Sequence, residues 1–99
     1  MIAFGSQTPE TKEIEDLVRP QFPDVLAYRY NSASIRIRII DERFRGMSRV
    51  ERDRIVDPLL ETLPEETQAD ITILLLLAPE ETDASLMNLE FEHPAPSRL

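Results

Sequence analysis

The sequence predicts an α/β protein, in the α+β sense, with a small mixed three-stranded sheet packed against helices. Ile35, Ile37 and Ile39 alternate with arginines at the two-residue period of a half-buried strand. Residues 71–78 are almost continuously apolar, as in the interior strand of a sheet. Apolar residues at helical spacing separate these two segments, and a crossover helix makes the strands it joins parallel. The expected order is therefore α-β-β-α-β.

The first element is expected to be a helix over residues 9–18. Thr8 is a preferred N-cap residue, and Pro9 suits the first helical position because its missing amide is not needed there. Pro20 then ends the helix. The apolar stripe consists of Ile14, Leu17 and Val18.

Two strands are expected to follow as a hairpin. Residues 25–30 are rich in β-branched and aromatic side chains, residues 34–40 alternate, and residues 31–33 supply the turn. The alternation buries the isoleucine face of the second strand. Arg36 and Arg38 then face solvent or a partner.

The main helix is expected to begin near Arg49, after a polar loop over residues 41–47. Ser48 and Glu51 have the S-x-x-E spacing of a capping box, in which each side chain bonds the other residue's amide. Pro58 lacks the amide that a helix interior needs, so a kink or two abutting helical pieces are expected there. The apolar stripe comprises Val50, Ile55, Val56, Leu59, Leu60 and Leu63.

The C-terminal segment permits two interpretations. Met87, Leu89 and Phe91 alternate with polar residues, which favours a short strand, and a helix is the alternative. Such a strand would also allow a homodimer by pairing across a sheet edge. We expect one domain over residues 1–99, with loose tails at 1–7 and 94–99.

Composition excludes several kinds of chemistry. The chain has no cysteine and two glycines, which removes disulfides, thiolate ligands and glycine-rich phosphate loops. Its net charge of −8 disfavours nucleic acid and anionic membranes as partners. The longest apolar run, residues 73–78, is too short to cross a bilayer. A cytoplasmic protein without a targeting peptide is expected.

The residues contain no recognisable catalytic constellation. His93, the single histidine, lies in a proline-bounded tail, and the paired acids have the character of a solvated surface. We therefore expect a protein that is not an enzyme and has no cofactor. The alternative is a small hydrolase or metal-dependent enzyme that uses Asp41, Glu42 and Asp70.

An arginine-rich segment is the strongest positive signal. Seven arginines and four acids lie between Arg36 and Arg54, in a chain that is acidic overall. Guanidinium groups gathered on one surface bind carboxylates or phosphates. In the alternative interpretation, Arg36 and Arg38 lie along the open strand face while the others pair with nearby acids. The candidate partner-binding residues are Arg36, Arg38, Arg45, Arg49, Arg52 and Arg54.

Several segments between residues 12 and 81 together resemble the BolA-like proteins. The most specific is the F-x-G-x-S-x-x-E-R-x-R-[ILV]-V pattern from Phe44 to Val56. The resemblance implies a fold similar to the class II KH domain. It also implies a non-catalytic role, in which family members pair with monothiol glutaredoxins around a shared [2Fe–2S] cluster and some bind DNA. The other matching segments are Ile14 to Leu17, Phe22 to Val25, Ile37 to Ile40 and Ala78 to Glu81.

The chain departs from the family at the cluster ligands. Asp70 stands where the family has its cluster-ligating histidine, and Asp53 replaces a histidine of the helix motif. The hairpin loop, residues 31–33, is too short to carry the second ligand of relatives. A carboxylate is a poor ligand for cluster iron, so no Fe–S ligation and no metal site are expected. The G-x-x-G loop of nucleic-acid-binding KH domains is also absent.

Two hypotheses follow from the sequence. In the first, the chain is a BolA-like adaptor that has lost metal ligation and uses its arginine surface to contact a protein partner, with a monothiol glutaredoxin as the family's example. In the second, the same arginines bind nucleic acid weakly, as in a transcriptional regulator.

Overall fold

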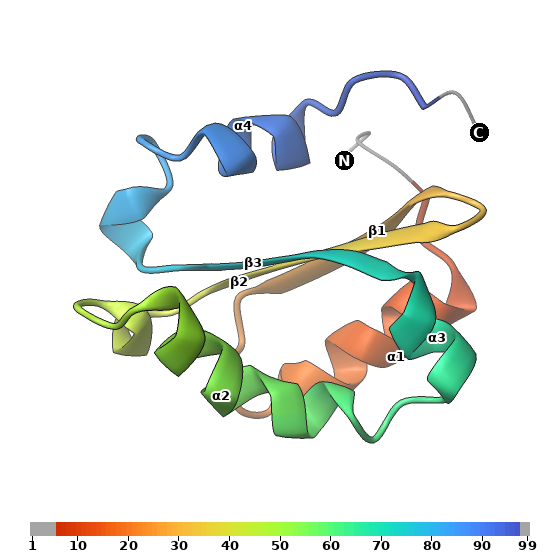
Figure 1. Ribbon diagram of the computed structural model, residues 1–99, viewed down its shortest axis with the longest axis horizontal. Coiled ribbons are helices and arrows are strands. Elements are labelled where there is room, and N and C mark those ends of the chain that lie inside the picture. The colour runs from red at the N-terminus through yellow and green to blue at the C-terminus, as the bar shows by residue number, and fades with distance from the viewer. Residues whose placement is uncertain (1–5, 98–99) are drawn as a thin grey trace.

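The computed structural model describes residues 6–97. It confirms the expected α-β-β-α-β order and the mixed three-stranded sheet, with short helices added (Figure 1). The elements are α1 (Pro9–Val18), β1 (Val25–Asn31), β2 (Ser34–Ile40), η1 (Glu42–Phe44), α2 (Arg49–Leu60), α3 (Glu65–Asp70), β3 (Ile71–Leu77), η2 (Pro79–Glu81) and α4 (Leu86–Glu92).

The sheet has the strand order β1-β2-β3, so β1 and β3 form its two edges. Strands β1 and β2 are antiparallel, with Ala27 opposite Ile37, and β2 and β3 are parallel, with Ile37 opposite Leu74. This arrangement confirms the predicted hairpin and crossover. Helices α1, α2 and α3 cover one face of the sheet, and α4 lies over the other (Figure 1).

The core lies between the sheet and the α1 and α2 helices. Ile35, Ile37 and Ile39 are fully buried there, as their alternation predicted. Phe22 and Phe44, which lie in connections rather than in the main helices, stack with ring centroids 5.6 Å apart. Because these large side chains are tightly packed in the core, they help to set the position of the helices relative to β2.

Helix α2 starts where it was predicted to start, and it is not divided into two pieces at Pro58. The Ser48 hydroxyl accepts from the Glu51 amide at 3.2 Å, and the Glu51 carboxylate accepts from the Ser48 amide at 2.8 Å. The helix then continues past Pro58 to Leu60 as one element rather than as two pieces. Its buried stripe is also narrower than expected, since Val50 and Ile55 are exposed.

Residues 86–92 form helix α4, so the predicted C-terminal strand is wrong. The Ser85 hydroxyl caps the helix by accepting from the Asn88 amide at 3.0 Å. The polar residues that mimicked the outer face of a strand instead turn toward arginines of β2, while Leu86 points to solvent. A homodimer was suggested because such a strand could pair across a sheet edge, and the helix removes this reason.

Both described ends of the chain contact β1. Ser6 forms an isolated bridge with Arg29, and the Asn31 amide donates to the Ser97 hydroxyl at 3.0 Å. The predicted loose tails also include residues 1–5 and 98–99, which lie outside the described residues. Among residues 6–97, no helix has the length and apolar character needed to cross a bilayer.

Gly46 permits the turn that leads into α2. Its φ of 77° lies in the left-handed region, which side-chain-bearing residues adopt at a cost of about 1–2 kcal/mol. We expect Gly46→Ala to lower the free energy of unfolding by about that amount, measured by urea denaturation. Gly46→Asn should lose less, because asparagine tolerates this conformation. Equal stability of all three proteins would contradict this role.

Candidate functional site

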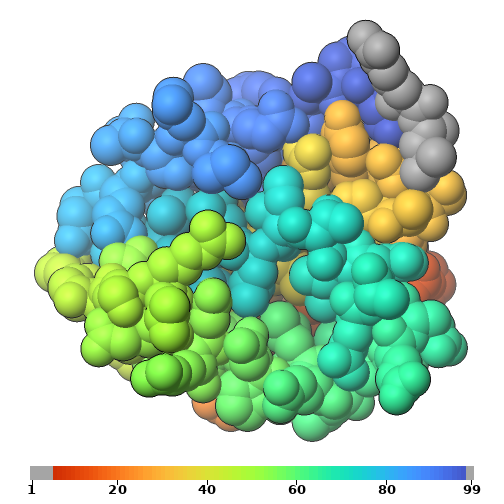
Figure 2. Space-filling view, viewed as in Figure 1, coloured from red at the N-terminus to blue at the C-terminus, as the bar shows by residue number. Residues whose placement is uncertain are grey.

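A groove of about 390 Å³ runs along the outer edge of β3. The start of α2 borders it on one side and Met87 of α4 borders it on the other. In Figure 2, the groove lies where the yellow-green, teal and blue segments meet. The lining residues are Met47, Arg49, Arg52, Asp53, Thr72, Ile73, Leu74, Leu75, Leu76 and Met87.

The opposite edge of the sheet is closed by the chain itself. Along β1, the Arg29 amide donates to the Ser6 carbonyl at 2.8 Å, and the Ala27 amide donates to the Glu15 carboxylate at 2.8 Å. The role of Glu15 could not be predicted from the sequence, because this residue occupies an ordinary position on α1. Its burial against a strand edge depends on tertiary packing.

At the β3 edge, one backbone group is capped by a side chain. The Arg52 guanidinium donates to the Leu76 carbonyl at 2.9 Å, so this carbonyl points away from β2. The next carbonyl, of Leu77, accepts from Asp41 at the end of β2 and so points the opposite way. Because backbone groups alternate in direction along a strand, the amide and carbonyl of Leu74 face the groove.

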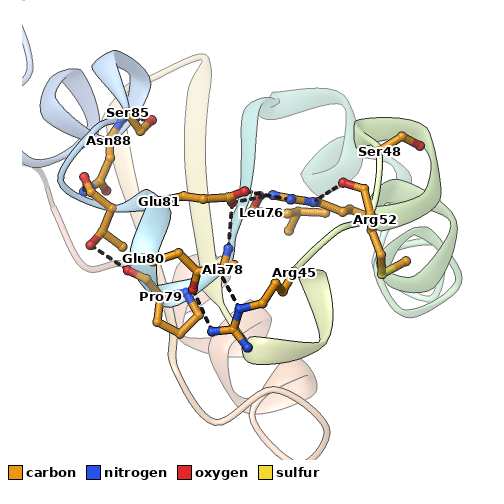
Figure 3. A network of polar contacts seen from close by, with 12 residues as sticks. Arg45, Ser48, Arg52, Leu76, Ala78, Pro79, Glu80, Glu81, Ser85 and Asn88 are labelled. Carbon is orange, nitrogen blue, oxygen red and sulfur yellow. Dashed lines mark hydrogen bonds and ion pairs between the residues drawn. The ribbon is translucent and has the colours of Figure 1, made fainter.

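Arg52 joins three segments at the end of the groove (Figure 3). Its guanidinium also donates to the Met47 carbonyl at 3.0 Å and holds both oxygens of Glu81, at 2.6 and 2.9 Å. The Glu81 carboxylate accepts a further bond from the Ala78 amide at 2.8 Å. These donors, with Arg52 first, lower the pKa of Glu81 to about 2.

Arg45 makes the neighbouring contact on the surface. Its Nε and Nη2 atoms each lie 2.7 Å from an oxygen of Glu80, and this pairing holds the pKa of Glu80 below its usual value. Both side chains are exposed, so water screens the pair. The two bidentate pairs, shown in Figure 3, fasten η2 to the segment around the start of α2.

Arg49 and Arg54 differ from the other candidate arginines, because both are exposed and neither makes an ion pair with another described residue. Arg49 lines the groove, and Asp53 follows it one turn along α2. Val50, which is 58% exposed, lies four residues before Arg54 and so shares its helix face. This end of α2 therefore presents two arginines without ion pairs to described residues beside exposed Val50, although Glu51 lies near enough to Arg54 for their charges to attract.

The two arginines of β2 lie beneath α4 and not at the groove. Arg36 donates to Glu90 at 2.8 Å and stacks over the Tyr30 ring, with its guanidinium carbon 3.7 Å from the ring centroid. Arg38 donates to Asn88 at 2.8 Å. Both side chains are about nine-tenths buried. The sequence predicted that this face of β2 meets solvent or a partner. In the structure, helix α4 of the same chain covers it.

The structure thus divides the six predicted site residues. Arg45, Arg49, Arg52 and Arg54 lie around the start of α2, whereas Arg36 and Arg38 anchor α4. Glu80 and Glu81, the partners of Arg45 and Arg52, were not among the predicted site residues. The only indication in the sequence was that Ala78 to Glu81 belongs to the BolA-like pattern. Two adjacent acids are ordinarily solvated surface residues, so their pairing with arginines was not predicted.

The carboxylates of the enzyme alternative do not come together. Asp41 follows β2 and pairs with Arg43 at 2.9 Å, whereas Asp70 precedes β3 and pairs with Arg29 at 3.1 Å. Since β2 and β3 are parallel, these acids lie at opposite ends of the sheet. Within residues 6–97, no three His, Cys, Asp or Glu side chains form a metal-binding group.

Asp70 is also a poor fit for an iron–sulfur cluster. Its carboxylate oxygen is held by the Arg29 guanidinium, which Glu10 shares at 3.1 Å. A hard oxygen ligand already engaged by a cation competes weakly with thiolate or imidazole for cluster iron. Asp70, paired with Arg29, therefore does not suit an iron–sulfur cluster.

These elements, in this order and with this strand arrangement, form a BolA-like α/β fold. One matching solved structure is BolA1 from Arabidopsis thaliana, which is 18% identical with a TM-score of 0.56. The match covers 76% of this chain and 98% of that one. No protein-family model and no curated protein sequence matches the chain.

The low pKa of Glu81 makes stability depend on pH. A carboxyl with an ordinary pKa of 4.5 that falls to about 2 in the folded protein stabilises it above pH 4.5, and this stabilisation is lost as pH decreases toward 2. We expect Glu81→Gln to lower the free energy of unfolding at pH 7. The free energy of unfolding of this variant should also decrease less between pH 4.5 and pH 2 than that of the original protein. The measurement is urea denaturation at a series of pH values.

Glu66→Gln is the matched control for this experiment. Glu66 is exposed and makes no ion pair with another described residue, so this variant should keep the pH dependence of the original protein. An identical decline in the Glu81→Gln protein would show that the contact with Arg52 does not stabilise the fold.

Proposed function

We propose that the chain is a non-enzymatic, BolA-like adaptor that binds a protein partner through one surface at the start of α2. This α2-start surface consists of Arg45, Arg49, Val50 and Arg54. The observation that carries the proposal is the charge of Arg49 and Arg54 beside the exposed side chain of Val50.

The composition of this surface supports a protein partner. Arginine is enriched in protein interfaces, where its fork binds carboxylates and its stem covers apolar atoms. Val50 is 58% exposed although it is apolar. Burying it against a partner would add apolar contact to the charge pairing.

The positive charges of Arg49 and Arg54 favour a partner with an acidic surface. We infer that a monothiol glutaredoxin is the first candidate, bound without a cluster ligand from Asp70, since that carboxylate pairs with Arg29. Nucleic acid is less well supported. Glu80 and Glu81 neutralise Arg45 and Arg52, and the net charge of −8 repels a phosphate backbone.

The test compares two variants that lose the same charge. We expect Arg49→Ala combined with Arg54→Ala to weaken partner binding by at least about tenfold, or about 1.4 kcal/mol, because both arginines are free to pair. Lys12→Ala combined with Arg19→Ala removes one cation of α1 and the cation at its C-cap, and should leave binding intact. Thermal stability should change little in both.

Tagged protein would capture partners from a lysate of the source organism with and without nuclease, and titration with purified monothiol glutaredoxin would follow. Nuclease-resistant capture that the α2 variant loses supports the proposal. Equal capture by both variants would contradict it. Capture that requires intact nucleic acid would support the transcriptional-regulator alternative instead.

A further inference from the structure

We propose that the groove beside β3 accepts an extended segment of a partner polypeptide as a fourth strand, with an acidic side chain of that segment on Arg49. The inference rests on the proposed adaptor function, because the segment belongs to the bound partner. To the α2-start surface it adds a mode of binding, which is strand addition at β3, and a requirement for an acidic side chain opposite Arg49.

The first support is the difference between the two edges of the sheet. Ser6 bonds both the amide and the carbonyl of Arg29 on the outer edge of β1, and Glu15 accepts from the Ala27 amide. On β3, Arg52 caps the Leu76 carbonyl, and no described residue bonds the outward groups of Leu74. Protein chains usually cover or pair such edges, because open ones recruit other strands.

The second support is the shape of the groove. The start of α2 and Met87 of α4 stand on its two sides, so a strand placed there would be covered on both faces (Figure 2). The lining from Thr72 to Leu76 spans about 13 Å at the usual rise of a strand. Arg52 closes one end by its bond to Leu76.

The third support is the chemistry of the lining. Ile73, Leu74 and Leu75 are half-buried, and Met47 and Met87 supply adaptable apolar contact. A polypeptide strand offers the alternating N–H and C=O groups that the Leu74 backbone can bond, together with side chains for this lining. The occupant is therefore an extended peptide.

The fourth support is the charge of the groove. Arg49 lines it without an ion-pair partner among residues 6–97, which calls for a carboxylate on the occupant. Asp53, which also lines the groove, repels anions on its side, so the groove suits a single carboxylate placed at Arg49 and not a run of phosphates. The favoured segment is apolar and β-prone with one acidic residue.

The experiment uses the full chain labelled with ¹⁵N and the blocked hexapeptide VTVEVT as probe. Hydrogen exchange of the Leu74 amide should slow at least tenfold when the peptide saturates the protein, because the amide gains a partner. The Ala27 amide, which already donates to Glu15, is the internal control and should not change. No added protection at Leu74 would overturn the proposal.

A charge exchange tests the role of Arg49. VTVKVT should bind the original chain at least fivefold more weakly than VTVEVT, and Arg49→Glu should reverse that order. An unchanged preference would overturn the assignment. Protection of Leu74 that grows with protein concentration in the absence of peptide would also overturn it, since the edge would then pair with a second copy.

These outcomes separate the two proposals. Arg54 belongs to the α2-start surface but does not line the groove, so Arg54→Ala should weaken partner capture and leave peptide binding unchanged. If peptide protection fails while capture still depends on Arg49 and Arg54, only the strand mode is wrong. If capture is insensitive to both arginines, the adaptor surface is wrong even when the peptide binds.

Discussion

Arg52 holds the region around the groove together. Its guanidinium contacts the loop before α2 through the Met47 carbonyl, the end of β3 through Leu76 and the turn after β3 through Glu81. An arginine can serve three segments at once because its five N–H donors are fixed in one plane. Loss of this group would leave the Leu76 carbonyl and a carboxylate without their main partner, and the start of α2 would lose its fixed distance from β3.

The arginine-rich segment therefore serves three purposes that its sequence does not distinguish. Arg36 and Arg38 attach α4 to the sheet, and Arg52 joins the groove walls. The remaining free charge is concentrated on Arg49 and Arg54. An acidic protein can thus present a small cationic surface, since the other arginines within residues 6–97 have carboxylate partners.

Local patterns predicted most of the fold. The alternation in β2, the apolar run of β3 and the capping box at Ser48 each depend on residues close in sequence, and all three were confirmed. Helix α4 was only the alternative prediction, because Glu90 and Glu92 look like solvent-facing residues until β2 brings arginines beneath them. Arg52 was predicted on a binding surface for a similar reason: its partner Glu81 lies 29 positions away in the sequence, so the pairing was not visible there.

The most direct measurement of the account is a map of amide shifts in the ¹⁵N-labelled chain as a captured, purified partner is added. The account predicts shifts confined to the start of α2, the β3 edge and the adjoining end of α4 around Met87. Shifts centred on α1 or on the closed edge of β1, with Arg49 and Leu74 unaffected, would contradict it.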